Sequence, residues 1–210
     1  MPAIISGPIW VRPEVLGLTP PIIFNIMKRI FIGIPIEKEI QAEILKLQEI
    51  ISTDLKKQDQ AYQIRGVKPG NLHITLMPPW RIEERDIFDI EQKLKTINFK
   101  SFEIKFNKIE FGPSLHRPNL FWLKGELSKE ILDFRQKIYK TLGQEPDARP
   151  FFPHVTLARF KKENFINIQK NNIIIQISWS MQVKDFALYE SHLLPNGADY
   201  TALAQFSLGN

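Results

Sequence analysis

Apolar positions along the chain follow two spacings, and each spacing predicts its own kind of element. Apolar residues three or four positions apart run through residues 37–57, which predicts an amphipathic helix. We expect further helices over 83–94 and from the N-cap residue Ser128 to Gly143. Runs rich in β-branched and aromatic residues predict strands at 29–34, 72–77, 102–111, 120–124, 154–157, 179–190 and 200–208. The pair Pro78-Pro79 is expected to end the second of these strands.

The order strand, helix, strand occurs twice along the chain. The first set comprises the strand around Ile30, the helix over 37–57 and the strand that holds His73. The second comprises the strand around Phe121, the helix after Ser128 and the strand that holds His154, 81 residues after His73. We interpret this order as an internal pseudo-duplication that produces two related lobes, whose sheets face a shared cleft.

The last strand of each set carries the same four-residue pattern of His, β-branched residue, Thr and Leu. It reads His73-Ile74-Thr75-Leu76 in the first half and His154-Val155-Thr156-Leu157 in the second. Side chains alternate between the two faces of a strand, so His and Thr share one face and the apolar pair anchors the other. A single such histidine is usually a hydrogen-bonded strand residue, but packing does not require the same polar pair twice.

Twin imidazoles and twin hydroxyls suit acid–base chemistry on a phosphoryl group. Histidine has an ordinary pKa of about 6.5, so two histidines can act as base and acid in one step. Threonine hydroxyls can hydrogen-bond phosphoryl oxygens, and phosphoryl transfer depends mainly on positioning and charge stabilisation. No carboxylate follows either histidine at metal-ligand spacing, and the chain has no Cys, so we expect neither a zinc site nor another cofactor.

Composition is that of an ordinary globular protein with a basic balance. Hydrophobic residues make up 43% and charged residues 24% of the chain, and the formal net charge is +5. That excess suits a partner that carries phosphates. Without cysteine, disulfides and thiolate catalysis are excluded. No apolar run is long enough to span a membrane, and we expect a cytoplasmic protein with no membrane contact and no obligate protein partner.

The twin motif resembles that of the 2H phosphoesterase superfamily, and within it the RNA 2′,3′-cyclic phosphodiesterases, which are 2′-5′ RNA ligase-like. The resemblance runs from about Lys28 to the C-terminus and includes the segments RIFIGIP, GPSLHRPNLFWLKGE, RPFFPHVTLARF and ESHLLPNGADYTALAQFSL. One departure is Met77-Pro78-Pro79-Trp80 after the first motif, where those phosphodiesterases often have Phe-Leu-Gly. The resemblance implies an α+β, bilobal, pseudo-duplicated fold with two antiparallel sheets that face a central cleft and helices on the outer faces.

The resemblance also implies an activity and a role for each motif residue. The activity is metal-independent hydrolysis of RNA 2′,3′-cyclic phosphate ends to 2′-phosphomonoesters, with RNA ends or small cyclic nucleotides as partners. His73 would be the proton donor to the departing O3′, and His154 the proton acceptor from the attacking water. Thr75 and Thr156 would bind the nonbridging phosphate oxygens.

Residues beside the second motif are further candidates. The family often has a basic residue at the position of Arg159, but regular alternation places Arg159 on the opposite face to His154. A bulge or the strand end would bring it into the site, where it could bind phosphate; otherwise it is a solvated surface charge. Phe152 could stack on a base or pack in the core. The other two histidines, His116 and His192, lack the motif and are read as surface residues.

Two alternatives stay open. One is another enzyme activity, either 2′-5′ joining of RNA ends or hydrolysis of another small cyclic or 2′-5′ linked nucleotide. The other is a non-catalytic module that binds RNA ends.

The first 26 residues differ from the remainder of the chain. They hold five of the fifteen prolines and only two charged residues, and the family-like pattern begins directly after them. We expect residues 1–26 to be an N-terminal extension outside the core fold, and residues 27–210 to form a single bilobal domain.

Overall fold

A computed structural model describes residues 26–58, 64–113, 118–161, 175–195 and 197–209 of this chain. The expected extension therefore lies outside the described residues, apart from Ile26. The helices are α1 (Lys38–Gln58), α2 (Ile87–Lys95) and α3 (Lys129–Leu142), with short 3-10 turns η2 (Pro69–Asn71) and η3 (Glu84–Asp86). The strands are β1 (Met27–Pro35), β2 (Ile64–Gly66), β3 (His73–Glu83), β4 (Phe102–Gly112), β5 (Leu120–Gly125), β6 (His154–Phe160), β7 (Ile175–Val183), β8 (Asp185–Leu194) and β9 (Gly197–Ser207).

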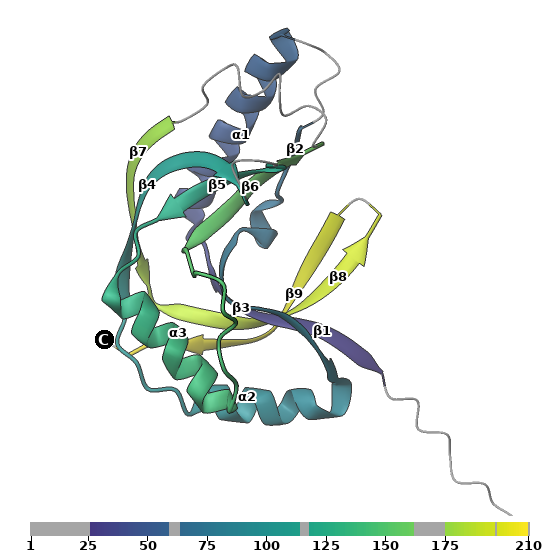
Figure 1. Cartoon of the computed structure of the whole chain (residues 1–210), viewed down its shortest axis with the longest axis vertical. Helices are drawn as coiled ribbons and strands as arrows, with labels where there is room; N and C mark the ends of the chain where they lie inside the picture. The colour runs from purple at the N-terminus through teal and green to yellow at the C-terminus, as the bar shows by residue number, and fades with distance from the viewer. Residues whose placement is uncertain (1–25, 59–63, 114–117, 162–174, 196, 210) are drawn as a thin grey trace, which may run out of the picture.

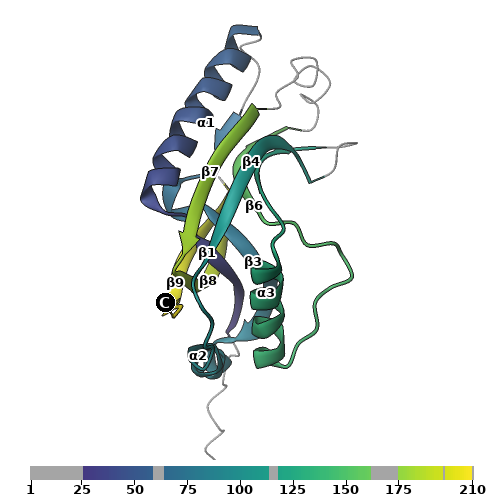
Figure 2. The same cartoon turned by 90° about the vertical axis from the view of Figure 1, so that its left-hand side faces the viewer.

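The strands form one curled antiparallel sheet, with α1 near one end of the molecule and α2 and α3 near the other (Figures 1 and 2). The strand order is β7-β4-β5-β6-β3-β1-β8-β9, and β2 pairs with β6. The expected α+β, pseudo-duplicated architecture is thus confirmed. Its two sheets are the halves of one continuous sheet, β7-β4-β5-β6 and β3-β1-β8-β9.

The two halves meet where the motif strands lie side by side. Only one residue pair of the described strands, Ile74 with Val155, is in register between β3 and β6. Both residues occupy the position after the motif histidine, so the two motifs are related by an approximate twofold axis at this pair. Ile74 and Val155 are fully buried, which anchors the junction in the core.

Each motif strand contains a β-bulge at the fourth residue of its motif. In β3, Gly33 pairs with Thr75 and Ile32 with Met77, so Leu76 is the extra residue. In β6, Trp122 pairs with Thr156 and Phe121 with Ala158, so Leu157 is the extra residue. The repeat therefore includes the bulge as well as the side chains.

The main hydrophobic core lies between the helices and the face of the sheet opposite the motif histidines. It includes Ile44 of α1, Leu94 of α2 and Phe134 of α3, each at 0% exposure, together with the apolar motif residues. Helix α3 has the ends that the sequence predicts. The Ser128 hydroxyl accepts a hydrogen bond from the Ile131 amide at 3.4 Å, and Gly143 takes a left-handed conformation at φ 66°.

Three sequence-based boundaries are wrong. Strand β3 continues through Pro78 and Pro79, because these residues lie at a second irregularity of the β1–β3 register, where a regular ladder is already interrupted. The single strand expected over 179–190 is two strands, β7 and β8, which separate at Lys184. The helix expected from residue 83 begins as a 3-10 turn and becomes α-helical at Ile87.

Candidate active site

A pocket of about 510 Å³ opens between the two halves of the sheet, and all four polar motif residues line it. His73 and Thr75 reach it from β3, and His154 and Thr156 from β6. In an antiparallel pair the residues that flank a paired position face each other, so His73 lies across from Thr156, and Thr75 across from His154. The alternation of the two strands thus delivers two imidazoles and two hydroxyls to one cavity.

The His73 ring is oriented by its own strand and enclosed by aromatic rings. Its Nδ1 lies 2.8 Å from the Asn71 carbonyl oxygen, which can only accept, so Nδ1 carries the hydrogen. The Nε2 atom lies 3.1 Å from the Thr75 hydroxyl. The Phe31 and Tyr200 rings lie 4.7 and 5.1 Å from the imidazole centroid. Burial lowers the pKa of His73 to about 4, despite the opposing effect of the Asn71 carbonyl.

His154 repeats this arrangement with a different neighbour. Its Nδ1 lies 2.8 Å from the Phe152 carbonyl oxygen, again two residues earlier, so Nδ1 donates and Nε2 is left to act in the pocket. The Trp122 indole stacks on the imidazole at 4.1 Å between centroids. Burial lowers the pKa of His154 below its ordinary value, against the effect of the Phe152 carbonyl. In the free protein at neutral pH, both imidazoles are therefore mainly neutral.

Glycine is required where β1 passes beside the first motif. A Cβ atom on Gly33 would lie 2.9 Å from the Ile74 carbonyl oxygen and 3.2 Å from the His73 ring. A larger residue there would displace the backbone or the imidazole. The small residue in β1 is therefore part of the positioning of His73.

The bulge in β6 decides the position of Arg159. Because Leu157 is an extra residue, alternation shifts by one, and Arg159 lines the pocket with His154 and Thr156. Of the two placements that the sequence leaves open for Arg159, the bulge selects the one at the site.

The carbonyl oxygen at each bulge is bound by a helix from the opposite set of elements. Gln48 of α1 donates from Nε2 to the Leu157 carbonyl at 2.8 Å, and Arg135 of α3 donates from Nε to the Leu76 carbonyl at 3.0 Å. Gln48 Nε2 also donates to the Val67 carbonyl at 2.9 Å. Each helix thus supports the motif strand of the other half. Sequence reasoning missed both residues, because their partners are backbone atoms distant in the chain.

The pocket is cationic. Four basic side chains line it, and no Asp or Glu of the described segments does. These residues are Arg29, Arg65, Lys68 and Arg159. Such a lining favours an anionic ligand. Sequence reasoning missed Arg29, Arg65 and Lys68. For Arg65 and Lys68, the one available signal was their position a few residues before the motif strand.

Asn71 joins the wall of the pocket to the β8–β9 hairpin. Its side chain donates to the Ala198 carbonyl at 3.0 Å and accepts from the Tyr200 amide at 3.2 Å. This residue is buried at 7% exposure, and its own carbonyl orients His73. These two hydrogen bonds of the Asn71 side chain explain how Tyr200 is held against the His73 imidazole.

The remaining sequence candidates lie elsewhere. Phe152 is 47% exposed and does not line the pocket. Its ring centroid lies 5.3 Å from Lys124 Nζ. His192 is exposed on β8 and does not line this pocket, whereas His116 lies outside the described residues. The described residues contain no cluster of three or more His, Asp or Glu that could hold a metal ion. Among these residues, no helix has the length and apolar character to cross a membrane.

Comparison with known proteins agrees with this geometry. The sequence profile of the 2′-5′ RNA ligase superfamily matches residues 37–193. The chain is 28% identical over 186 residues to the RNA 2′,3′-cyclic phosphodiesterase of Archaeoglobus fulgidus, covering 85% of this chain and 99% of that protein. It is 24% identical over 191 residues to the protein of the same name in Aquifex aeolicus, covering 86% and 97%.

Solved structures share the fold. E. coli LigT complexed with 3′-AMP superposes with a TM-score of 0.66 at 21% identity, covering 88% of this chain and 99% of LigT. The TT0787 protein of Thermus thermophilus gives 0.62 at 22% identity, covering 87% and 99%. The profile spans well over half of the chain, and the twin motifs converge on one pocket. This chain belongs to the 2′-5′ RNA ligase superfamily and is a 2H phosphoesterase.

Proposed function

We propose that this protein hydrolyses RNA 2′,3′-cyclic phosphate ends to 2′-phosphomonoesters by acid–base catalysis with two histidines. The observation that carries the proposal is the convergence of both motif histidines and both motif threonines on one pocket with four basic side chains. The names of the relatives add the substrate class.

In the proposed reaction, His154 Nε2 takes a proton from a water molecule as its oxygen attacks phosphorus. The P–O3′ bond breaks, and His73 gives the proton on its Nε2 to the departing O3′. The products are a 3′-hydroxyl and a 2′-phosphomonoester. Thr75, Thr156 and Arg159 donate hydrogen bonds to the nonbridging oxygens and stabilise the charge that develops on them.

The Thr75 hydroxyl couples proton transfer to phosphate binding. With neutral His73, Nε2 accepts a hydrogen bond from Thr75 at 3.1 Å. With protonated His73, Nε2 donates to the same oxygen, so the hydroxyl hydrogen becomes available to a phosphate oxygen. Proton uptake by His73 therefore frees the Thr75 hydroxyl to donate a hydrogen bond to the phosphate.

Product analysis tests the proposal. The protein is incubated in EDTA with 2′,3′-cyclic AMP and with a short RNA that ends in a 2′,3′-cyclic phosphate, and the monoesters are separated. We expect 2′-phosphate products from both. A 3′-phosphate would refute the assigned bond cleavage, and joined RNA would indicate 2′-5′ ligation. Loss of activity in EDTA, restored by one added metal, would refute metal independence. Tight RNA binding without product would indicate the non-catalytic module.

The pH dependence should differ between the free and the bound protein. Burial lowers both histidine pKa values, that of His73 to about 4, so the protonated form of the pair is lost as pH rises toward the ordinary value of about 6.5. We expect a bell-shaped kcat/KM profile for 2′,3′-cyclic AMP, with its descending limb below about pH 6.5. A bound phosphate anion stabilises imidazolium, so the kcat profile should lie at higher pH. Superimposable profiles for kcat and kcat/KM would contradict this coupling.

A further inference from the structure

A second, smaller cavity of about 390 Å³ continues from the pocket along strand β1. Arg29 lines both cavities. Strand register places Arg29 on the same face as Phe31, which contacts His73, and about 7 Å further along the strand. The two cavities are therefore neighbouring parts of one surface that share Arg29.

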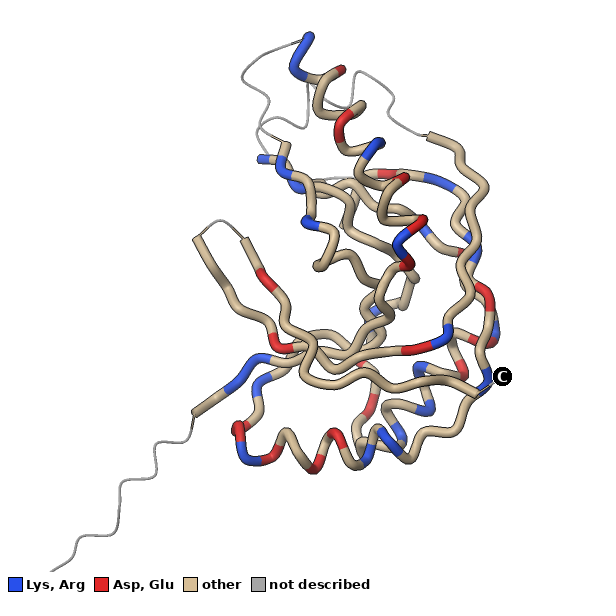
Figure 3. Tube along the Cα trace, turned by 180° about the vertical axis from the view of Figure 1, so that it is seen from behind, with Lys and Arg blue, Asp and Glu red and all other residues tan. Residues whose placement is uncertain are grey.

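The second cavity holds two arginines in a costly arrangement. Arg29 of β1 is the register partner of Arg81 of β3, and basic positions lie side by side on the Cα trace of these two neighbouring strands (Figure 3). Paired residues share one face of a sheet, so the two like charges destabilise each other without an anion. Arg29 leans toward β8 and donates to the Ser191 hydroxyl at 2.6 Å. Arg81 is exposed and forms no ion pair with any described residue. This pair presents paired positive charge next to the pocket.

Apolar side chains also line this cavity. Met27, Leu193 and Leu194 line it and are 49%, 72% and 51% exposed. Among the described residues of the lining, Glu190 is the one carboxylate, and its Oε1 lies 3.0 Å from Lys28 Nζ. Cationic groups beside an apolar wall match the chemistry of a nucleotide, which has a phosphate and a flat base.

We propose that this second cavity binds the RNA backbone immediately 5′ of the cyclic end, with Arg29 and Arg81 on a phosphate and the apolar wall against a base. The inference rests on the proposed function. A 2′,3′-cyclic phosphate occupies the 3′ terminus, so the rest of the RNA leaves the pocket only in the 5′ direction. The cavity therefore favours an RNA chain with a cyclic end over a free cyclic mononucleotide, although both are substrates.

The test compares two substrates in one variant. Arg81→Ala removes a charge that is absent from the lining of the catalytic pocket. We expect it to lower kcat/KM about 10-fold for a tetranucleotide with a 2′,3′-cyclic end, and to leave that for 2′,3′-cyclic AMP unchanged. Equal effects on both substrates, or an effect on neither, would overturn the proposal.

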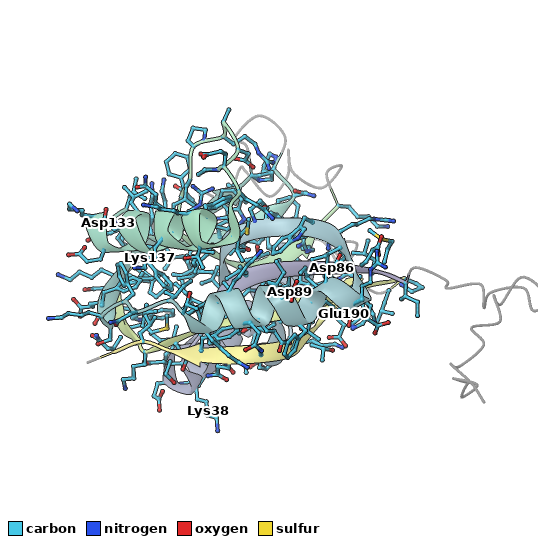
Figure 4. All side chains as sticks on the ribbon, turned by 90° about the horizontal axis from the view of Figure 1, so that it is seen from below. Lys38, Asp86, Asp89, Asp133, Lys137 and Glu190 are labelled. Carbon is cyan, nitrogen blue, oxygen red and sulfur yellow. The ribbon has the colours of Figure 1, made fainter. Side chains whose placement is uncertain are left out.

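Lys137→Ala is the matched control. Lys137 is an exposed residue of α3, a helix whose opposite side packs in the main core. In Figure 4, Lys137 lies well away from Glu190, which lines the second cavity. This variant removes one positive charge elsewhere and should leave kcat/KM unchanged for both substrates. If Lys137→Ala lowers kcat/KM for the tetranucleotide as much as Arg81→Ala does, the effect comes from net charge. That result would refute the proposed cavity.

A binding measurement separates failure of this inference from failure of the proposed function. Fluorescence anisotropy measures the Kd of a labelled tetranucleotide that ends in a 2′-phosphate, over a range of salt concentrations. Arg81→Ala should raise Kd about 10-fold and, because one phosphate fewer is neutralised, reduce the slope of log K against log salt by about 0.7. If the wild type hydrolyses neither substrate, the proposed function fails. An Arg81-dependent Kd then supports the cavity, and an unchanged Kd overturns it.

Discussion

Replacement of either motif histidine by alanine should lower kcat for 2′,3′-cyclic AMP by about 10²–10⁴-fold, the usual contribution of a positioned general acid or base. His73 and His154 both present Nε2 to the pocket while Nδ1 is held by a carbonyl two residues earlier, so neither can replace the other. Because the proposed mechanism uses both histidines in one step, the loss of kcat in the double variant should be far smaller than the product of the two single losses.

The measurement is steady-state hydrolysis of 2′,3′-cyclic AMP, with the urea midpoint of each variant determined in parallel. His192→Ala is the matched control, since His192 is exposed on β8 and does not line the pocket. Because His73 packs against Phe31 and Tyr200, His73→Gln separates the loss of proton transfer from the loss of packing. If His73→Gln or His154→Ala retains near wild-type kcat, the two-histidine mechanism is wrong.

Replacement of Ile74 by alanine should lower the free energy of unfolding by about 2–5 kcal/mol, the usual cost of truncating a buried isoleucine. Ile74 is fully buried, and its pairing with Val155 joins the two halves of the sheet. This pair also sets the spacing of the two motifs. A small displacement of catalytic groups can cost about 10²-fold in rate, so kcat should fall even where the variant is folded.

Urea unfolding measures this effect, and kcat is determined at a urea concentration and temperature where the variant is native. The matched control is Ile50→Ala on α1, because Ile50 is 52% exposed and its truncation should change stability by no more than about 0.5 kcal/mol. If Ile74→Ala unfolds at the wild-type midpoint, the junction does not hold the halves together.

The sequence was sufficient to predict the repeat and the shared face of its polar side chains, because periodicity is a local property. Alternation in His73-Ile74-Thr75 shows which side chains share a face. Two copies of the pattern indicate that both serve one functional site. The caps of α3 at Ser128 and Gly143 were likewise readable, since each depends on one residue type at one place.

What the sequence could not provide depends on pairing between distant strands. The bulge at Leu157, which brings Arg159 to the pocket, is defined by its register with β5 and has no residue signature of its own. Strand β3 runs through Pro78-Pro79 because the ladder with β1 is already irregular there. The hydrogen bonds of Gln48 and Arg135 to bulge carbonyls join residues 109 and 59 positions apart, beyond the reach of any local pattern.

The crossed support of the two bulges has a consequence for how the chain can be divided. Gln48 belongs to the first repeat and secures the second motif, whereas Arg135 belongs to the second and secures the first. A fragment that contains one repeat alone would leave the bulge carbonyl of its motif without the side-chain donor that the other repeat supplies. The two repeats are therefore mutually dependent and not separable modules.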